Sequence, residues 1–123
     1  MADDTVNGDI RVALVGLGEI GELFAEMLLE QTQVKNAPVK IVAVADRHLD
    51  SPIALGFAQN NIPVFEDALD LVDLGDKVDI IFNLTENPSV DVSMNLRLMK
   101  NKNRHTVIVP VMVAKLLQVF FAD

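Results

Sequence analysis

The chain alternates between short apolar runs and longer stretches in which apolar residues recur every three or four positions. The apolar runs cover residues 10–15, 39–45, 62–65, 78–84 and 106–109. Continuous apolar runs are typical of parallel strands covered on both faces, whereas the three-to-four spacing is typical of helices with one buried side. The pattern therefore predicts a three-layer α/β fold with a doubly wound parallel sheet of about five strands.

The expected helices lie between and after these strands, over residues 19–32, 52–59, 66–74, 88–100 and 111–121. Two of them begin with a side chain that can cap a helix, followed by proline in the first turn, at Ser51-Pro52 and Asn87-Pro88. The expected strand order is 3-2-1-4-5, in which the winding direction reverses between the first and fourth strands. A ligand is expected in the crevice at the carboxyl ends of these two strands.

A glycine-rich turn, Gly-Leu-Gly-Glu-Ile-Gly, joins the first strand to the first helix at residues 16–21. Gly16 allows the sharp turn, Gly18 lets a pyrophosphate approach the backbone, and Gly21 lets the helix pack close to the strand. The amides of the first helical turn lack intrahelical partners and attract phosphate. The motif predicts that a dinucleotide binds here through the backbone of Gly16, Leu17, Gly18, Glu19 and Ile20. The alternative is a glycine-rich turn without a ligand.

An acid, Asp46, follows the second strand 25 residues after Gly21. A carboxylate at this position accepts hydrogen bonds from the adenosine ribose and repels a 2′-phosphate, so NAD is expected in preference to NADP. The alternative for Asp46 is an acid that only bonds the loop or caps a helix. The adjacent Arg47 keeps NADP as an alternative, because a guanidinium pairs with that phosphate or stacks on adenine. Arg47 is equally well explained as a solvated surface side chain.

The end of the fourth strand is expected to line the same crevice through Leu84, Thr85 and Asn87. Thr85 and Asn87 are candidates to bond the nicotinamide ribose, although Asn87 is equally well explained as a helix cap alone. Asn83 is expected to be buried, where its amide needs hydrogen-bond partners.

The composition narrows the class of protein. The chain has 123 residues, enough for one domain, with residues 1–9 expected to be a flexible N-terminus and 10–123 the binding domain. The formal net charge of −8 argues against nucleic acid or an anionic membrane as partner. The N-terminus lacks a secretory signal and no stretch is apolar enough to span a bilayer, so a cytoplasmic protein is expected.

No catalytic or metal-binding constellation is found in the sequence. The absence of cysteine excludes disulfides, thiolate catalysis and cysteine-ligated metals. The two histidines, His48 and His105, are separated in the chain and are expected to be solvated rather than metal ligands. No pair of carboxylates and no serine lies in a recognisable catalytic pattern.

The first strand, its glycine turn and the residues Val-Ala-Val-Ala-Asp-Arg at 42–47 resemble the N-terminal cofactor domain of Gfo/Idh/MocA oxidoreductases. Homoserine and aspartate dehydrogenases have a domain of this type. The resemblance extends through residues 62–67 and 78–85 and implies binding of NAD(P). In that family a Thr-Pro-Asn-like segment lies near the nicotinamide ribose, where this chain has Thr85-Glu86-Asn87-Pro88.

The chain departs from that family in two ways. A Glu-Lys-Pro motif with a catalytic lysine follows the fifth strand in the family, whereas this chain has Val-Pro-Val-Met at 109–112 and a lysine only at Lys115, to which we do not transfer the role. The 123 residues also do not include the α+β substrate domain of that family. We therefore expect the cofactor domain of an oxidoreductase, and we expect this chain on its own not to be catalytic. Alternatives are an NAD(H)-sensing module of a signalling protein and, disfavoured by its glycine spacing, an S-adenosylmethionine-dependent methyltransferase fragment.

The last stretch, residues 111–121, is too apolar for an exposed surface helix. Part of it is expected to pack on the sheet. The remainder, with Leu116, Val119 and Phe120, is expected to bury against a second subunit in a homodimer or against a downstream domain. The alternative is a helix that is wholly internal.

Overall fold

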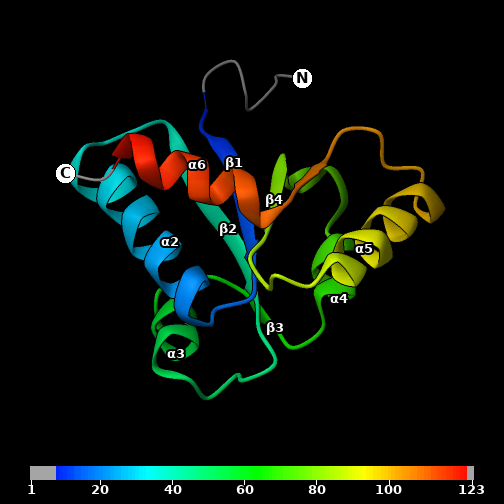
Figure 1. Ribbon diagram of the computed structural model, residues 1–123, viewed down its shortest axis with the longest axis horizontal. Coiled ribbons are helices and arrows are strands. Elements are labelled where there is room, and N and C mark those ends of the chain that lie inside the picture. Colours follow the sequence, from blue (N-terminus) through cyan, green and yellow to red (C-terminus); the bar gives the residue numbers. More distant parts are fainter. Residues whose placement is uncertain (1–7, 122–123) are drawn as a thin grey trace.

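The computed structural model describes residues 8–121, and it contains one five-stranded parallel sheet (Figure 1). The strand order is β3-β2-β1-β4-β5, which confirms the predicted order and the three-layer α/β fold. Most of the N-terminal segment expected to be flexible, residues 1–7, lies outside the described residues. The strands are β1 (Ile10–Val15), β2 (Val39–Ala45), β3 (Val64–Phe65), β4 (Ile80–Asn83) and β5 (Val107–Val109).

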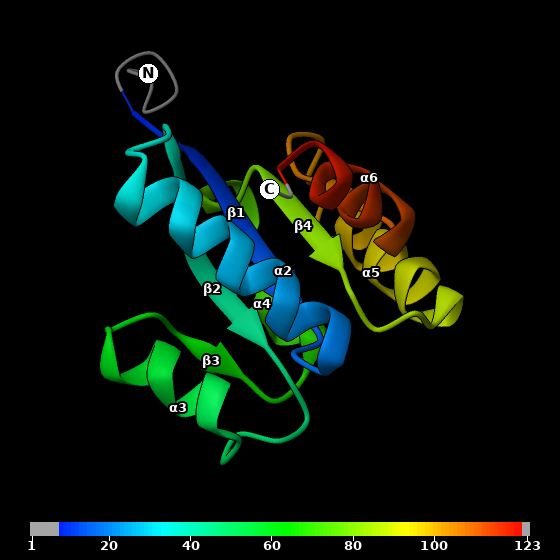
Figure 2. The same ribbon diagram turned by 60° about the vertical axis from the view of Figure 1, so that its left-hand side comes forward.

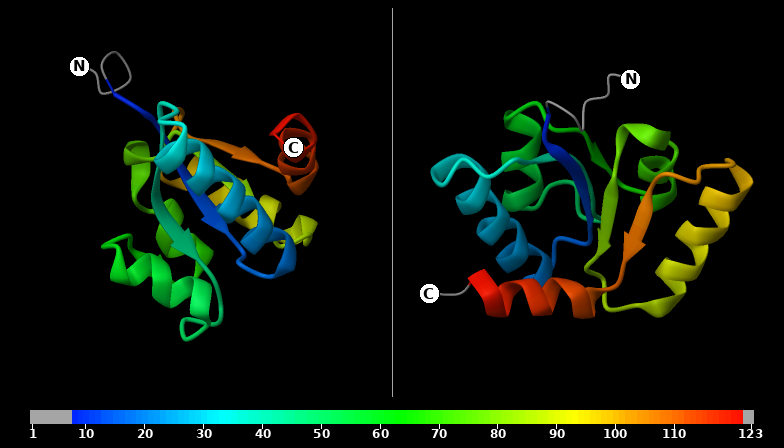
Figure 3. Two further views of the ribbon diagram at one scale, coloured as in Figure 1. Left: turned by 90° about the vertical axis from the view of Figure 1, so that its left-hand side faces the viewer. Right: turned by 90° about the horizontal axis from the view of Figure 1, so that it is seen from above.

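Helices cover both faces of the sheet (Figures 2 and 3). One apolar core joins α2, α3 and α6 to the sheet, and a second core joins α4 and α5 to its other face. The helices are α2 (Glu19–Leu29), α3 (Pro52–Gln59), α4 (Ala68–Val72), α5 (Pro88–Lys100) and α6 (Val111–Phe121), with a π-helix η1 (Glu30–Val34) and a 3-10 helix η2 (Gly75–Lys77).

Several elements begin or end differently from the prediction. The helix expected over residues 19–32 continues beyond α2 as the π-helix, in which Thr32 Oγ1 donates to the carbonyl of Leu29 at 3.3 Å. Three strands are shorter than their apolar runs. β3 shows the reason, because it pairs only with Val44 and Ala45 at the end of β2. The length of a strand therefore depends on how many residues pair with the neighbouring strand, and not on the apolar run alone.

The central strand β1 supplies both cores. Val12 and Leu14 pack on the α2 side, whereas the neighbouring positions pack on the α4–α5 side, as expected for successive residues of a strand. The rings of Phe24 and Phe82 lie 4.8 Å apart at 53° on the α2 side. Burial on both faces explains why β1 and β2 read as continuous apolar runs.

A charged network closes the amino ends of β1, β4 and β5. Asp79 Oδ2 accepts from the Arg11 amide at 2.7 Å, and Asp79 Oδ1 accepts from Arg11 Nη2 at 2.8 Å. His105 Nε2 also contacts Asp79 Oδ1. His105, expected to be simply solvated, thus has a carboxylate partner, although about half of its side chain is exposed. The hydrogen bonds from Arg11 are the main cause that holds the pKa of Asp79 well below its usual range.

This network predicts how stability changes in acid. A depressed pKa in the folded state means that Asp79 stabilises the fold above the unfolded value of about 4, and that this contribution is lost as the pH falls below it. We expect Asp79→Asn to lower the free energy of unfolding by about 1 kcal/mol at pH 7, because a charged hydrogen-bond acceptor is lost. Urea unfolding from pH 7 to pH 3 should show the difference from the wild type shrinking in acid.

The exposed Asp76 offers the matched control, because its backbone carbonyl, not its side chain, accepts from Arg11. Asp76→Asn should change the free energy of unfolding little at any of these pH values. A difference between Asp79→Asn and wild type that is constant across the range would contradict the assigned role of the Asp79 carboxylate.

Candidate functional site

A cleft of about 1220 Å³ lies at the carboxyl ends of the strands. Its walls come from the turn after β1, the residues after β2 and β4, and the amino-terminal parts of α4 and α5. The neighbours β1 and β4 pair in parallel, and the chain winds in opposite directions on either side of them. The cleft therefore lies where α/β sheets of this kind bind their ligands, at the reversal of the winding.

The three glycines of the turn after β1 have different surroundings. Gly16 has φ +95°, and a Cβ there would lie 2.9 Å from the Thr85 methyl carbon. A Cβ on Gly21 would lie 1.9 Å from the carbonyl oxygen of Gly16, far inside contact distance. Gly18, in contrast, has no atom within 4 Å of the corresponding position. Gly16 and Gly21 are thus required by the turn and its packing, whereas Gly18 faces open space in the cleft.

The amino end of α2 opens into this space. Gly18 is the N-cap residue and has no side chain to bond the amides of the first turn. Glu19 and Ile20 line the cleft beside it. Amides at an uncapped helix start, together with the positive end of the helix dipole, form a site for an anion.

Other predicted residues of the turn have structural partners. The Leu17 amide donates to Asp46 Oδ1 at 2.8 Å, and the Gly16 amide donates to the Ala45 carbonyl at 2.8 Å. The Leu17 side chain is buried in the core rather than in the cleft lining. Of the residues predicted to hold a pyrophosphate, Gly18, Glu19 and Ile20 therefore present the amides best placed for a ligand.

Asp46 links the glycine turn to the segment after β2. Besides Leu17, it accepts a hydrogen bond from the His48 amide, through Oδ2 at 2.9 Å. The side chain is partly buried, and each carboxylate oxygen keeps a second lone pair for a ligand. The Asp46 carboxylate thus bonds the loop, and it also lies in the cleft lining beside the exposed Arg47 and His48.

The end of β4 forms a second rigid wall. Asn83 is buried, as predicted, and its Oδ1 accepts from the Thr85 amide at 3.1 Å and from the Thr85 hydroxyl at 2.6 Å. Asn87 caps α5 by accepting from the Ser89 amide at 3.1 Å. Leu84, Thr85 and Asn87 all line the cleft, so the structure places them together on the wall opposite Asp46.

The sequence interpretation missed the part of the lining that comes from α4 and α5. These residues are Glu66, Asp67, Ala68, Leu69, Asp70, Ser89, Val90, Ser93 and Met94. Residues 66–70 had a usable signal, because they follow β3, whose carboxyl end lies beside that of β2. They also change the electrostatics, since the cleft lining has one arginine and these acids: Glu19, Asp46, Glu66, Asp67, Asp70 and Glu86.

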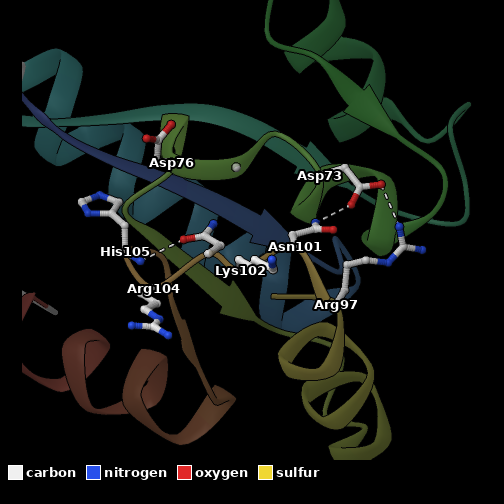
Figure 4. Close-up of a pocket in the computed structure, with 9 residues that line it drawn as sticks. Asp73, Asp76, Arg97, Asn101, Lys102, Arg104 and His105 are labelled. Carbon is white, nitrogen blue, oxygen red and sulfur yellow. Dashed lines mark hydrogen bonds and ion pairs between the residues drawn. The ribbon is translucent and has the colours of Figure 1, made fainter. Parts of the chain in front are cut away.

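A second groove, of about 860 Å³, lies at the other end of the strands, near the residues that precede β4 and β5 (Figure 4). Two of its charged groups form an ion pair, in which Asp73 accepts from Arg97 at 2.8 Å, and Asp73 also accepts from Asn101 at 2.8 Å. The hydrogen bond from Asn101, with the nearby Arg97, lowers the pKa of Asp73. These contacts join the end of α4 to the end of α5, so Asp73, Arg97 and Asn101 have a structural role there.

Within residues 8–121, no group of three or more histidine, cysteine, aspartate or glutamate side chains is arranged to hold a metal ion. No helix in this range is long and apolar enough to cross a membrane.

No protein-family model matches the sequence, and no curated protein matches it significantly. Solved structures do. Myo-inositol 2-dehydrogenase from Lactobacillus plantarum is 28% identical over 83% of this chain and 27% of its own, with a TM-score of 0.59. S. aureus homoserine dehydrogenase is 21% identical over 90% of this chain and 29% of its own, with a TM-score of 0.63.

A third structure, scyllo-inositol dehydrogenase from Lactobacillus casei with bound NAD(H) and scyllo-inositol, is 22% identical over 83% of this chain and 27% of its own, with a TM-score of 0.57. The chain thus spans between a quarter and a third of the length of these neighbours. These inositol dehydrogenases, which are of the Gfo/Idh/MocA type, and the homoserine dehydrogenases agree with the resemblance indicated by the glycine turn and residues 42–47. In sequence motif and in fold, the chain resembles the N-terminal Rossmann domain of Gfo/Idh/MocA-type oxidoreductases and of homoserine dehydrogenases.

Proposed function

We propose that this chain is the cofactor-binding domain of an NAD(P)-dependent oxidoreductase. One observation carries the proposal: Gly18 faces open space at the uncapped start of α2, while Gly16 and Gly21 are closed in by contacts. A turn that served only to connect a strand to a helix would need the two closed glycines but not the open one. The diphosphate of the cofactor would rest on the amides of Gly18, Glu19 and Ile20.

The two walls of the cleft determine the orientation in which the cofactor would bind. The adenosine ribose would bond to Asp46, and the nicotinamide ribose would lie beside Leu84, Thr85 and Asn87. The network around Asn83 fixes that second wall before any ligand binds. When bound, the nicotinamide supplies the hydride chemistry, and this chain supplies its orientation.

The electrostatics favour NAD over NADP. A 2′-phosphate adds about two negative charges next to Asp46, in a cleft whose lining is already rich in acids. Arg47 is the one arginine in that lining, and it is exposed, so its attraction is weakened by solvent. Support for a nicotinamide cofactor also comes from the neighbour that holds NAD(H).

Catalysis is proposed only for a protein in which this domain is joined to a catalytic part, because the chain spans a minor share of its neighbours. The Nζ of Lys115 lies 3.6 Å from Oε2 of Glu86, which lines the cleft. We assign it no catalytic role. No described feature favours the sensor alternative. The cytoplasm is the compartment we propose, as the composition suggested.

The glycine assignment predicts opposite effects for two similar substitutions. Gly18→Ala should fold normally, because φ is −74° there and a Cβ meets nothing, but it should weaken NAD binding at least about tenfold by filling the diphosphate site. Gly21→Ala should lose stability, because its Cβ collides with the Gly16 carbonyl. Calorimetric titration with NAD+ and NADH, together with thermal unfolding, measures both properties.

Gly56 provides the matched control. It lies in α3, outside the cleft lining, and a Cβ there also meets nothing within 4 Å. Gly56→Ala should keep NAD affinity and stabilise the helix by roughly 0.5–1 kcal/mol. If Gly18→Ala bound NAD as tightly as the wild type, the diphosphate site would have to lie elsewhere.

The assignment of Asp46 predicts that NAD binds more tightly than NADP, and that Asp46→Ala narrows the gap. The change also removes the acceptor for the Leu17 amide, so NAD affinity should fall while NADP affinity falls less or rises. Asp70→Asn is the control, because it removes one cleft acid outside the ribose position. Equal affinities of the wild type for both cofactors would contradict the role of Asp46.

A further inference from the structure

Helix α6 has a second apolar face, which points away from the core. Its inner side packs through Ala114, which is fully buried, and through Leu117. Its outer side carries a continuous set of exposed apolar residues, which we call the α6 stripe: Met112, Val113, Leu116, Val119 and Phe120. Figure 3 shows α6 along one margin of the molecule, with no other element over its outer side.

The α6 stripe is large for the free surface of a small monomer. Met112, Val119 and Phe120 are each exposed by two thirds or more of their area, at 67%, 74% and 73%. Together the exposed parts of the stripe amount to roughly 500 Å², toward the upper end of the largest patch on typical monomers. A standard interface buries about 800 Å² per partner, so a stripe of this size supplies most of one weak interface.

Charge decides what kind of surface can cover the α6 stripe. The chain has a formal net charge of −8, so two copies repel each other through most of their surfaces. The only charged residue of α6 is Lys115, and Glu86 of the same chain pairs with it at 3.6 Å. The stripe itself has no charge, so two copies can approach there without placing like charges opposite one another.

The order of side chains makes the α6 stripe complementary to itself. Met112, Leu116 and Phe120 follow one another at four-residue spacing, with Leu116 at the centre. If two such helices pack antiparallel about a two-fold axis, Leu116 meets the partner's Leu116, and Met112 meets the partner's Phe120. A flexible thioether against an aromatic ring is a favourable contact, and it occurs twice because the axis repeats it.

We propose that the α6 stripe binds a second copy of this chain, with the two α6 helices antiparallel about a two-fold axis at Leu116. The modest area predicts a dissociation constant in the micromolar range or weaker. The proposal does not rest on the cofactor assignment, since no residue of the stripe lines the cleft.

The oligomeric state of the full 123-residue chain tests the proposal. Sedimentation equilibrium from low micromolar to near-millimolar concentration should show a monomer–dimer equilibrium for the wild type. Leu116→Glu places two carboxylates opposite each other on the axis, and it should raise the dissociation constant at least about tenfold. Because Leu116 is 54% exposed, the variant should retain the far-ultraviolet circular dichroism of the wild type.

Leu96 of α5 is the matched control, because it is a leucine on another helix with 59% exposure. Leu96→Glu should leave the dimer intact. A wild type that stays monomeric at the highest concentration would overturn the proposal and favour a downstream domain as the occupant of the α6 stripe. So would a dimer that survives Leu116→Glu but dissociates in Leu96→Glu, since that result would move the interface to α5.

A cross-linking experiment tests the axis itself, and the chain suits it because it has no cysteine. Leu116→Cys places one thiol beside its copy on the axis, so a short bismaleimide should link the two chains efficiently. Leu96→Cys should give little linked dimer under the same conditions. Equal linking of the two variants would show random collision and contradict the proposed axis.

Discussion

The structure depends on one close approach, between the start of α2 and the turn after β1. A methyl group on Gly21 would collide with the carbonyl oxygen of Gly16, and one on Gly16 would collide with Thr85. This contact sets α2 with its amino end directed into the cleft, beside the end of β4. Thr85 lies close to Gly16 through both its methyl carbon and its backbone, so the end of β4 and the turn after β1 are in direct contact. A cleft built this way is formed in advance of its ligand, which lowers the entropy lost on binding.

Side chains then reinforce that geometry at two points. Asp46 bonds the amide of Leu17 across the β1–β2 boundary, and Asn83 bonds the turn that ends in Thr85. Asp46 serves both the fold and the site, because it also lines the cleft, whereas the buried Asn83 acts on the site through Thr85. Near the amino ends of the strands, Asp79 and Asp73 have a different role. Asp79 joins β4 to β1 through its ion pair with Arg11, and Asp73 joins α4 to α5 through its ion pair with Arg97.

Local patterns predicted most of the fold, because apolar spacing, caps and the glycine turn act over a few residues. The cap at Asn87 and the bounds of β1, β2, α5 and α6 are examples. The sequence did not reveal which amides of the turn stay available, since the bond between Leu17 and Asp46 joins residues 29 positions apart. It also missed the pairing of Arg11 with Asp79, which lie 68 positions apart. The contribution of α4 and α5 to the cleft depends on how each helix is rotated about its axis. The positions of the strand ends in the sequence do not determine that rotation.

The central claim is that a dinucleotide binds through the amides at the start of α2, and amide chemical shifts report on it directly. In ¹⁵N-labelled protein titrated with NAD+, the largest shifts should fall on Gly18, Glu19 and Ile20, with smaller shifts at Thr85 and His48. The amides around Asp73 and Lys102, at the far groove, should not move. Shifts confined to that far groove, or no shifts at the start of α2 at saturating NAD+, would contradict the account.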